Sequence, residues 1–284
     1  MRSINKFITA MIFFGTISIF IKNISLSSGE IAFWRAFIAL LFLLLYLLIK
    51  KQSLALYRIK KQLLKLFLSG VAMGLNWIFL FEAYHYTTVA MATLCYYFAP
   101  VLVIILSIFL FQEKLDLRQS LCFLSASLGL ILMIGSKASS KSNIHGILLG
   151  LGAALFYALV ILINKSIPDV DGLIRTVLQF IAAILILLPY LLLTGGFKIA
   201  ALSATGLLNL LVIGILHTGI MYVFYFTSLS FLKGSQIAIL SYLDPLTAIF
   251  ISIVLLKETF TFIQLLGGAI LLASTLLSQA SKTH

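Results

Sequence analysis

The sequence predicts an all-α integral membrane protein of ten transmembrane helices, arranged as two inverted-topology repeats of five. Three observations predict this fold: an excess of apolar residues, ten apolar segments of helical length, and a proline–glutamate pair that recurs at one spacing. The chain is 62% hydrophobic and 10% charged, with a mean hydropathy of +1.17. A soluble domain carries about 25% charged residues, so this much apolar surface requires lipid as its solvent.

Ten apolar segments are each long enough, at about 20 residues, to cross the hydrocarbon core as a helix. Runs such as ALLFLLLYLLI do not alternate apolar and polar residues, as strands of a membrane barrel would. Arg2 and Lys6 precede the first segment as in a signal peptide, but no small-residue cleavage site follows before Lys22, so we expect this helix to be retained. The predicted helices span residues 5–22, 30–49, 63–84, 88–111, 118–136, 144–164, 172–193, 204–228, 235–256 and 261–280.

The fourth and ninth segments carry the repeat. Each holds a proline followed thirteen residues later by a glutamate, Pro100 with Glu113 and Pro245 with Glu258, and both residues recur at an offset of 145. This offset is close to half the chain, so the sequence predicts repeats over residues 1–140 and 141–284. Because each repeat has an odd number of helices, the second is inverted relative to the first. Such duplicated membrane halves are typical of secondary transporters, whose substrate site lies between the repeats.

The loop charges predict the orientation. Fourteen of the 20 Lys and Arg residues fall on the side of the two termini, and the run from residue 50 to 65 contributes most of this excess. Lys and Arg collect on the cytoplasmic side of membrane proteins, so we expect both termini in the cytoplasm and the chain in the cytoplasmic membrane. Glu113 then lies at the inner surface and Glu258 at the outer surface. We expect these two loop charges to be end caps or gate contacts rather than substrate ligands.

Several classes of function are excluded by the same composition. The net charge of +12 does not indicate nucleic-acid binding, because the basic residues lie in predicted loops of a membrane protein. Cys95 and Cys122 lie inside apolar segments and predict buried thiols rather than a disulfide. The sequence shows no metal-ligand spacing, phosphate-binding loop or nucleophile motif. We therefore expect no cofactor, no metal, no catalytic residue and no enzymatic activity.

These features together resemble the EamA-type branch of the drug/metabolite transporter superfamily. In that family each repeat has a helix with a mid-membrane proline, an acidic residue just past it and a Gly-rich last helix. Here Pro100 and Glu113 are followed by LSASLGLILMIG, and Pro245 and Glu258 by LLGGAILLAS. The family often has an arginine near the start of the second helix, which FWRAFIALL supplies as Arg35, whereas the second half has no matching arginine. The resemblance covers nearly the whole chain.

The resemblance implies a fold of two inverted repeats of five helices and a transport function. It also implies a central cavity lined by the first, third, fourth, sixth, eighth and ninth helices. It does not fix the substrate, because the family moves amino acids, other metabolites and drugs. The sequence leaves the direction of transport open as well.

Ionisable side chains inside the hydrocarbon are costly and are therefore functional candidates. Asp244 precedes Pro245 near the middle of the ninth helix, where the proline cannot donate its backbone hydrogen bond. This carboxyl group could bind an amine or titrate as protons pass, or it could instead hydrogen-bond a neighbouring helix. His217 lies near the middle of the eighth helix. Imidazole titrates near neutral pH and suits a proton relay, but a neutral histidine bonded to a neighbouring helix is an equal alternative.

Two further charged residues lie towards the predicted outer side. Glu82, near the outer end of the third helix, is either an interfacial residue or part of a gate or substrate entry. Arg35, about one turn into the second helix, is predicted to snorkel to the interface or to pair with Glu30 or Glu82. Direct contact of Arg35 with the substrate is the alternative. The candidates for gating or coupling are Arg35, Glu82 and Asp244, and the predicted helix kinks are at Pro100 and Pro245.

Aromatic residues form two clusters that the repeat relates to each other, in the third and fourth and in the eighth and ninth helices. Trp77 aligns with Tyr222, and Tyr97 with Tyr242. A tryptophan in mid-membrane suggests a cavity wall, because this residue is usually interfacial, although ordinary packing would place single rings equally well. The candidate substrate-binding residues are Asn76, Trp77, Tyr96, Tyr97, His217, Tyr222, Tyr242 and Asp244.

Two pairs of glycines have a structural interpretation. Gly70 with Gly74, and Gly146 with Gly150, form GxxxG pairs in the third and sixth helices. Such pairs let two helices approach closely in a membrane. We expect all four glycines to lie at helix contacts rather than at a substrate site.

The sequence as a whole predicts a secondary transporter that exports small metabolites such as amino acids. An uptake permease for a small organic solute is the alternative, and an intramembrane enzyme or a membrane receptor is disfavoured because no catalytic constellation or signalling domain is evident. The expected partners are a small-molecule substrate and the lipid bilayer, with no nucleic acid. Protons as the coupling ion and a homodimer are left open.

Overall fold

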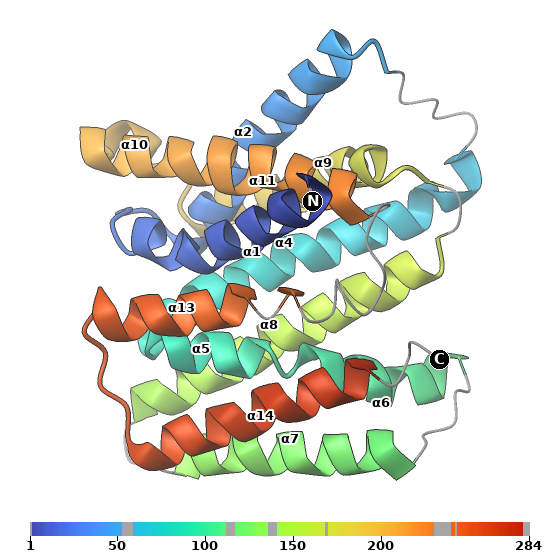
Figure 1. Ribbon diagram of the computed structural model, residues 1–284. Helices are drawn as coiled ribbons and strands as arrows, with labels where there is room; N and C mark the ends of the chain where they lie inside the picture. The colour runs from blue at the N-terminus through green and yellow to red at the C-terminus, as the bar shows by residue number, and fades with distance from the viewer. Residues whose placement is uncertain are drawn as a thin grey trace.

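In the computed structural model of the chain, the described residues are 2–52, 59–111, 117–135, 141–167, 170–229, 240–241 and 243–280, and they contain helices and no strand (Figure 1). Two helices of the first half begin with side-chain caps. Ser27 accepts a hydrogen bond from the backbone of Glu30 at the start of Ser28–Ile49, and Thr88 accepts one from the backbone of Met91 at the start of Val89–Tyr96. The elements of the first half are α1 (Arg2–Ile21), α2 (Ser28–Ile49), η1 (Lys60–Gln62), α4 (Leu63–Tyr86), α5 (Val89–Tyr96), α6 (Ala99–Phe111) and α7 (Leu117–Gly135).

The second half follows the same order of long and divided helices. Asp171 caps its second helix by accepting from the backbone of Leu173 and Ile174, and Gly195, with φ of 128°, ends that helix. The elements are α8 (Lys141–Lys165), α9 (Gly172–Thr194), η2 (Ile199–Ala201), α10 (Ala204–Leu211), η3 (Val212–Ile220), α11 (Met221–Leu229), α13 (Leu243–Val254) and α14 (Phe262–Ala280).

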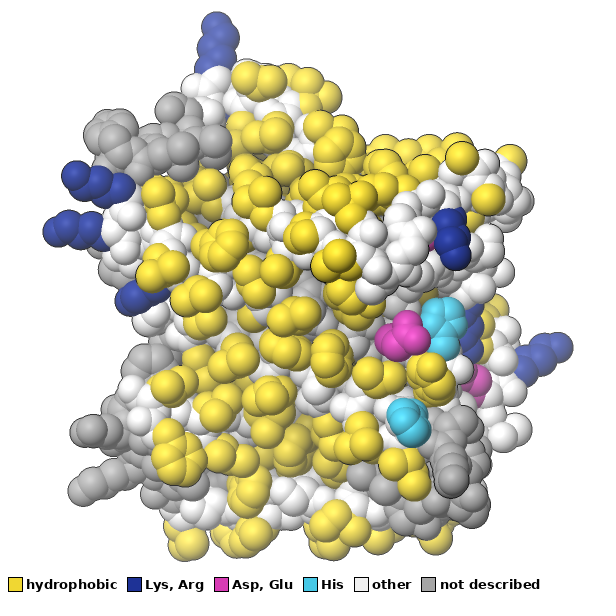
Figure 2. All heavy atoms as spheres, turned by 180° about the vertical axis from the view of Figure 1, so that it is seen from behind, with side chains coloured by type: hydrophobic (Ala, Val, Ile, Leu, Met, Phe, Trp, Pro, Cys, Tyr) yellow, Lys and Arg dark blue, Asp and Glu magenta, His cyan; other side chains and the backbone are white. Residues whose placement is uncertain are grey.

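Each of the ten predicted segments contains at least one helix in the described residues. Seven helical stretches there are long and apolar enough to cross a membrane, and three shorter apolar helices lie at residues 120–132, 243–254 and 262–274. Figure 2 shows apolar side chains across the middle of the visible face, with charged side chains at its margins. The all-helical membrane fold is confirmed, while ten complete crossings remain a prediction.

Two predicted helices differ in their local geometry from regular α-helix. The fourth is divided into α5 and α6 at Tyr97 and Phe98, because Pro100 has no N–H to donate to the carbonyl group of Tyr96, four residues earlier. The eighth contains a π-helix, η3, over nine residues. Pro245 lies in the first turn of α13, where a missing N–H leaves no helical bond unmade. A further proline, Pro189, lies inside α9 and was not among the predicted helix kinks.

The packing of the helices is nearly unchanged when the two halves are exchanged. The pairs α2 with α9 and α7 with α14 join equivalent helices of the two halves, and α5 with α13 joins parts of the fourth and ninth predicted helices. The contact of α4 with α8 has its counterpart in that of α1 with α11 and η3, and the contact of α4 with α9 in that of α2 with η3. Figure 1 shows α7 and α14 side by side and running in opposite directions, as an inverted repeat requires.

Glycines mark the closest helix approaches, as predicted. A Cβ on Gly70 would lie 2.4 Å from the carbonyl oxygen of Gln179, so α4 and α9 touch at the backbone there. Gly74, one turn later, leaves more room, since its nearest neighbours would be 3.5 Å away. Gly146 and Gly150 face Thr87 and α5 in the same way. These contacts hold α8, α4 and α9 in fixed relative positions around the interior polar residues.

Candidate functional site

The centre of the candidate site is a carboxyl group of the second half bonded to a tyrosine of the first. The Tyr97 hydroxyl donates to Asp244 Oδ2 at 2.5 Å, which joins the break between α5 and α6 to the first turn of α13. Helix α1 reaches the same place because Gly15 has no side chain: a Cβ there would lie 2.5 Å from the backbone carbonyl oxygen of Asp244. Asp244 therefore lies where both halves meet.

A buried arginine lies within electrostatic range of this carboxyl group. Arg35 Nε donates to Thr218 Oγ1 at 2.7 Å, and the guanidinium group lies over the rings of Trp77, at 4.6 Å, and Phe81, at 5.6 Å. The residue is only 6% exposed. Thr218 is held in turn by η3, because its hydroxyl donates to the carbonyl group of Ile213 at 2.7 Å. The cation thus comes from α2 and its anchor from the second half.

The prediction that Arg35 snorkels to the interface or pairs with Glu30 or Glu82 is wrong. Glu30 accepts instead from the backbone of Lys198 at 2.6 Å, and Glu82 from the Ser28 hydroxyl at 2.5 Å. Neither carboxylate forms an ion pair with Arg35 in the described part of the chain. The reason is that Trp77 and Thr218 attract the guanidinium group to the inner face of α2.

Tyrosines connect the two charges. The side chains of Tyr84, Tyr96 and Tyr222 all interact electrostatically with both Arg35 and Asp244, so they lie near both the cation and the carboxyl group. Tyr96, Tyr222 and Asp244 lie deep in the helix bundle yet keep part of their surface accessible. Groups that are deep and still accessible line an internal space, so these residues can contact a small solute.

Aromatic rings extend the walls on either side. Tyr96 packs against Tyr97 and Tyr157, with ring centroids 5.5 and 5.1 Å away. Phe180 of α9 packs between Trp77 and Tyr222, with each centroid separation 5.6 Å. The two predicted aromatic clusters therefore meet through Phe180. The sequence analysis did not single out Phe180 or Tyr157, and their ordinary apolar surroundings gave no signal.

Two other predicted site residues form their described hydrogen bonds away from Asp244, although His217 lies within electrostatic range of Arg35. The Asn76 amide donates to the carbonyl group of Ala153 at 2.7 Å and thereby joins α4 to α8. His217 Nε2 lies 2.8 Å from Thr16 Oγ1, and its ring packs against Phe20 of α1. These described contacts link helices and do not reach Asp244. Tyr242, Glu113 and the side chain of Pro100 lie outside the described residues.

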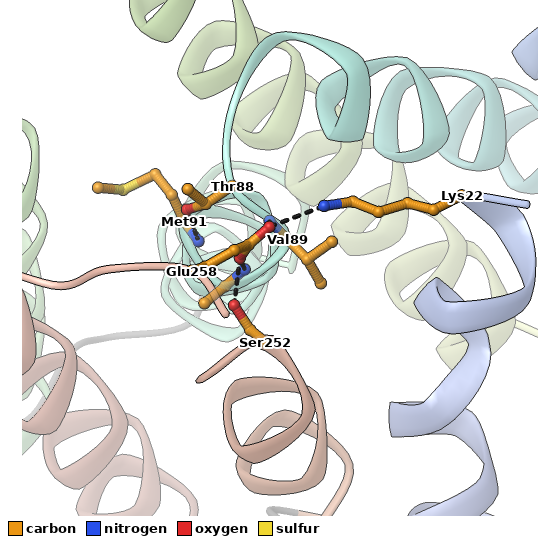
Figure 3. A network of polar contacts seen from close by, with 7 residues as sticks. Lys22, Thr88, Val89, Met91, Ser252 and Glu258 are labelled. Atoms are coloured by element: carbon orange, nitrogen blue, oxygen red, sulfur yellow. Dashed lines mark hydrogen bonds and ion pairs between the residues drawn. The ribbon is translucent and has the colours of Figure 1, made fainter. Parts of the chain in front are cut away.

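A second polar group, which we call the Glu258 clamp, joins the halves at one end of the molecule (Figure 3). Glu258 Oε1 accepts from Lys22 Nζ at 2.8 Å and from the backbone of Val89 at 3.0 Å. Its Oε2 accepts from the Ser252 hydroxyl and, at 3.4 Å, from the backbone of Ala90. The carboxylate thus caps the N-terminus of α5, where negative charge is favourable, and also binds the end of α1.

Comparisons with known proteins agree with this architecture. The sequence profile of the EamA-like transporter family matches residues 2–135 and again residues 144–279. The chain belongs to this family. It is 33% identical over 288 residues to an uncharacterized transporter, YxxF, of Bacillus subtilis, covering 98% of this chain and 91% of that protein.

An uncharacterized transporter of Archaeoglobus fulgidus is 29% identical over 272 residues, covering 95% of this chain and 94% of the relative. A protein of known crystal structure, 15% identical, has the same fold with a TM-score of 0.67, over 97% of this chain and 96% of the other. This EamA-type chain is therefore a multi-pass membrane transporter with the two-repeat architecture of its family.

Proposed function

We propose that this EamA-type protein is a secondary transporter that exports small metabolites such as amino acids across the cytoplasmic membrane by alternating access. The observation that carries the proposal is the interior site, in which Arg35 from the first half and Asp244 from the second lie within electrostatic range of each other and of three tyrosines. A substrate site between two repeats can be exposed to either side as the repeats move against each other.

The Glu258 clamp supports the alternating-access part of the proposal. It connects α1 and α5 of the first half with α13 of the second through a few polar contacts at one end of the molecule. The positive-inside rule predicts that this end faces the outside of the cell. Polar contacts of this kind break at small cost when water reaches them, as an outer gate requires.

Asp244 is the proposed site of proton coupling. Its described partner is a neutral tyrosine hydroxyl, and its carboxyl group is deep between the halves. A carboxyl group there can be charged when the site is open to water and protonated when it is closed. Transport that requires both states depends on the pH gradient.

The test is a binding screen followed by flux measurements. Purified full-length protein is screened by thermal shift against a metabolite library, since a ligand that binds the folded state stabilises it by mass action. Compounds that raise the unfolding temperature are then followed in right-side-out and inverted membrane vesicles. Faster movement out of the cytoplasmic compartment supports export, and faster movement inwards supports the uptake alternative. If no stabilising compound crosses the membrane faster with the protein than without it, the proposal is wrong.

A further inference from the structure

Arg35 is a buried cation with no carboxylate of the described residues within ion-pair distance, and Asp244 is the carboxylate within its electrostatic range. Lys22 with Glu258 is the sole ion pair in the described segments, and it lies at the end of α1. Arg35, in contrast, is 6% exposed and lies inside a membrane protein. A buried charge that no opposite charge contacts directly is costly, so an anionic ligand group that reached the guanidinium group would be bound favourably.

The contacts of Arg35 position its guanidinium group for an anion. The group has five N–H donors in a planar fork, of which Nε–H is taken by Thr218. Trp77 lies against one face of the plane, at 4.6 Å. The edge formed by the two terminal nitrogens is the part of a guanidinium group that binds a carboxylate with two parallel hydrogen bonds.

The carboxyl group of Asp244 provides the opposite pole. Its described hydrogen bond uses only Oδ2, with Tyr97 as donor. Tyr84, Tyr96 and Tyr222 lie within electrostatic range of both poles. Their hydroxyl groups can donate or accept, and their rings offer an apolar surface for the remainder of a solute.

We propose that Arg35 binds the anionic group of the transported solute while Asp244 binds its cationic group, so that the site selects zwitterions with an apolar or aromatic body. This inference rests on the proposed transport function and deepens it. It assigns Arg35 to substrate recognition, which the sequence left as the alternative to gating or coupling. It also predicts that a molecule with one of the two charges removed binds more weakly than the parent zwitterion.

The experiment uses matched sets of three compounds that differ only in charge. One set is phenylalanine, 2-phenylethylamine and 3-phenylpropionate, and equivalent sets are built from the other proteinogenic amino acids. Binding to the full-length protein in lipid nanodiscs is measured by thermal shift and by competition. We expect the best-bound zwitterion to bind at least about tenfold more tightly than either of its analogues, the effect of one charged hydrogen-bond partner.

Substitutions then identify which residue binds which group. Arg35→Gln is expected to weaken binding of the zwitterion and of the acid by about 10- to 100-fold and to leave binding of the amine unchanged. Asp244→Asn should weaken binding of the zwitterion and of the amine and leave binding of the acid unchanged. Arg175→Gln is the matched control, because Arg175 binds backbone carbonyl groups of Ile167 and Val170 at the end of α8 and lies outside the site.

The outcomes separate this inference from the transport function. If amines bind the wild-type protein as tightly as the zwitterions and cross the membrane, transport stands and the inference is overturned. A panel in which no zwitterion binds overturns it too, whatever the metabolite screen finds. Equal weakening of all three compounds by Arg35→Gln would show that Arg35 merely stabilises the fold around Trp77 and Thr218.

Discussion

Removing the carboxylate of the Glu258 clamp should open the predicted outer end of the molecule. In Glu258→Ala the backbone N–H of Val89 and the Ser252 hydroxyl lose their acceptor, and Lys22 loses its ion-pair partner. Lys22→Ala removes the ion pair alone. The two variants therefore separate the exposed part of the clamp from its buried part.

The expected size of each free-energy change follows from the exposure of the side chain that is removed. The Lys22 side chain is 34% exposed, and an exposed ion pair contributes only about 0.2–1 kcal/mol. The Glu258 side chain is 9% exposed, and hydrogen bonds to a charged group contribute about 1.5–3 kcal/mol each. Water replaces these bonds when this end of the molecule opens, so only part of their energy is lost. We therefore expect Glu258→Ala to raise the free energy of the closed state relative to the open state by about 2 kcal/mol. That shifts the ratio of open to closed molecules by about 30-fold, against at most about fivefold for Lys22→Ala.

The assay is a distance distribution between spin labels at Asn23 and Thr259, two exposed positions beside the clamp. The labels are introduced after the buried Cys95 and Cys122 have been replaced by alanine. Ser252→Ala should also populate the longer distance. Its control is Ser107→Ala, 145 positions earlier, because the Ser107 hydroxyl is buried with no hydrogen-bond partner among the described residues. An unchanged distribution in Glu258→Ala, or an equally large shift in Lys22→Ala, would refute the reasoning.

Three other changes test the fold and the mechanism. Gly70→Ala should destabilise the protein by about 1–3 kcal/mol, because the new Cβ would lie 2.4 Å from a backbone oxygen of α9. Gly74→Ala should be tolerated, since the nearest atoms to its Cβ would be 3.5 Å away. Equal melting temperatures of the two variants would contradict this. Single cysteines at Lys60 and Lys141 should react from opposite sides of the membrane, and labelling of both from the cytoplasm would remove the inverted repeat. Asp244→Asn should abolish the pH dependence of flux in vesicles while the protein stays folded, and an unchanged dependence would exclude this residue as the coupling site.

The sequence was sufficient for the features that depend on spacing and composition. Apolar length predicted the helices, and the offset between Pro100 and Pro245 predicted the duplication. Gly70 and Gly146 were expected at close helix contacts and are found there. These predictions succeed because helix length and small-residue spacing act locally, within one segment of the chain.

The direction of individual polar side chains could not be predicted in this way. Arg35 points inwards because of Thr218, which is 183 residues away in the sequence and is carried by an unpredicted π-helix. The partners of Glu258 at Lys22 and Val89 are 236 and 169 residues distant. Helical periodicity contains no information about such contacts, and the aromatic pattern indicated Trp77 without indicating the cation above it.

The division between α5 and α6 adds an electrostatic contribution that no side chain supplies. A helix that ends inside the bundle leaves carbonyl groups without helical donors, and its C-terminus carries a partial negative charge. The last turn of α5 ends at Tyr96, directly before the residue that binds Asp244. The N-termini of α6 and α13 lie at the same place, so Asp244 is surrounded by main-chain dipoles of both signs. Substitution of side chains can change which solute the protein carries and still leave these main-chain dipoles in place.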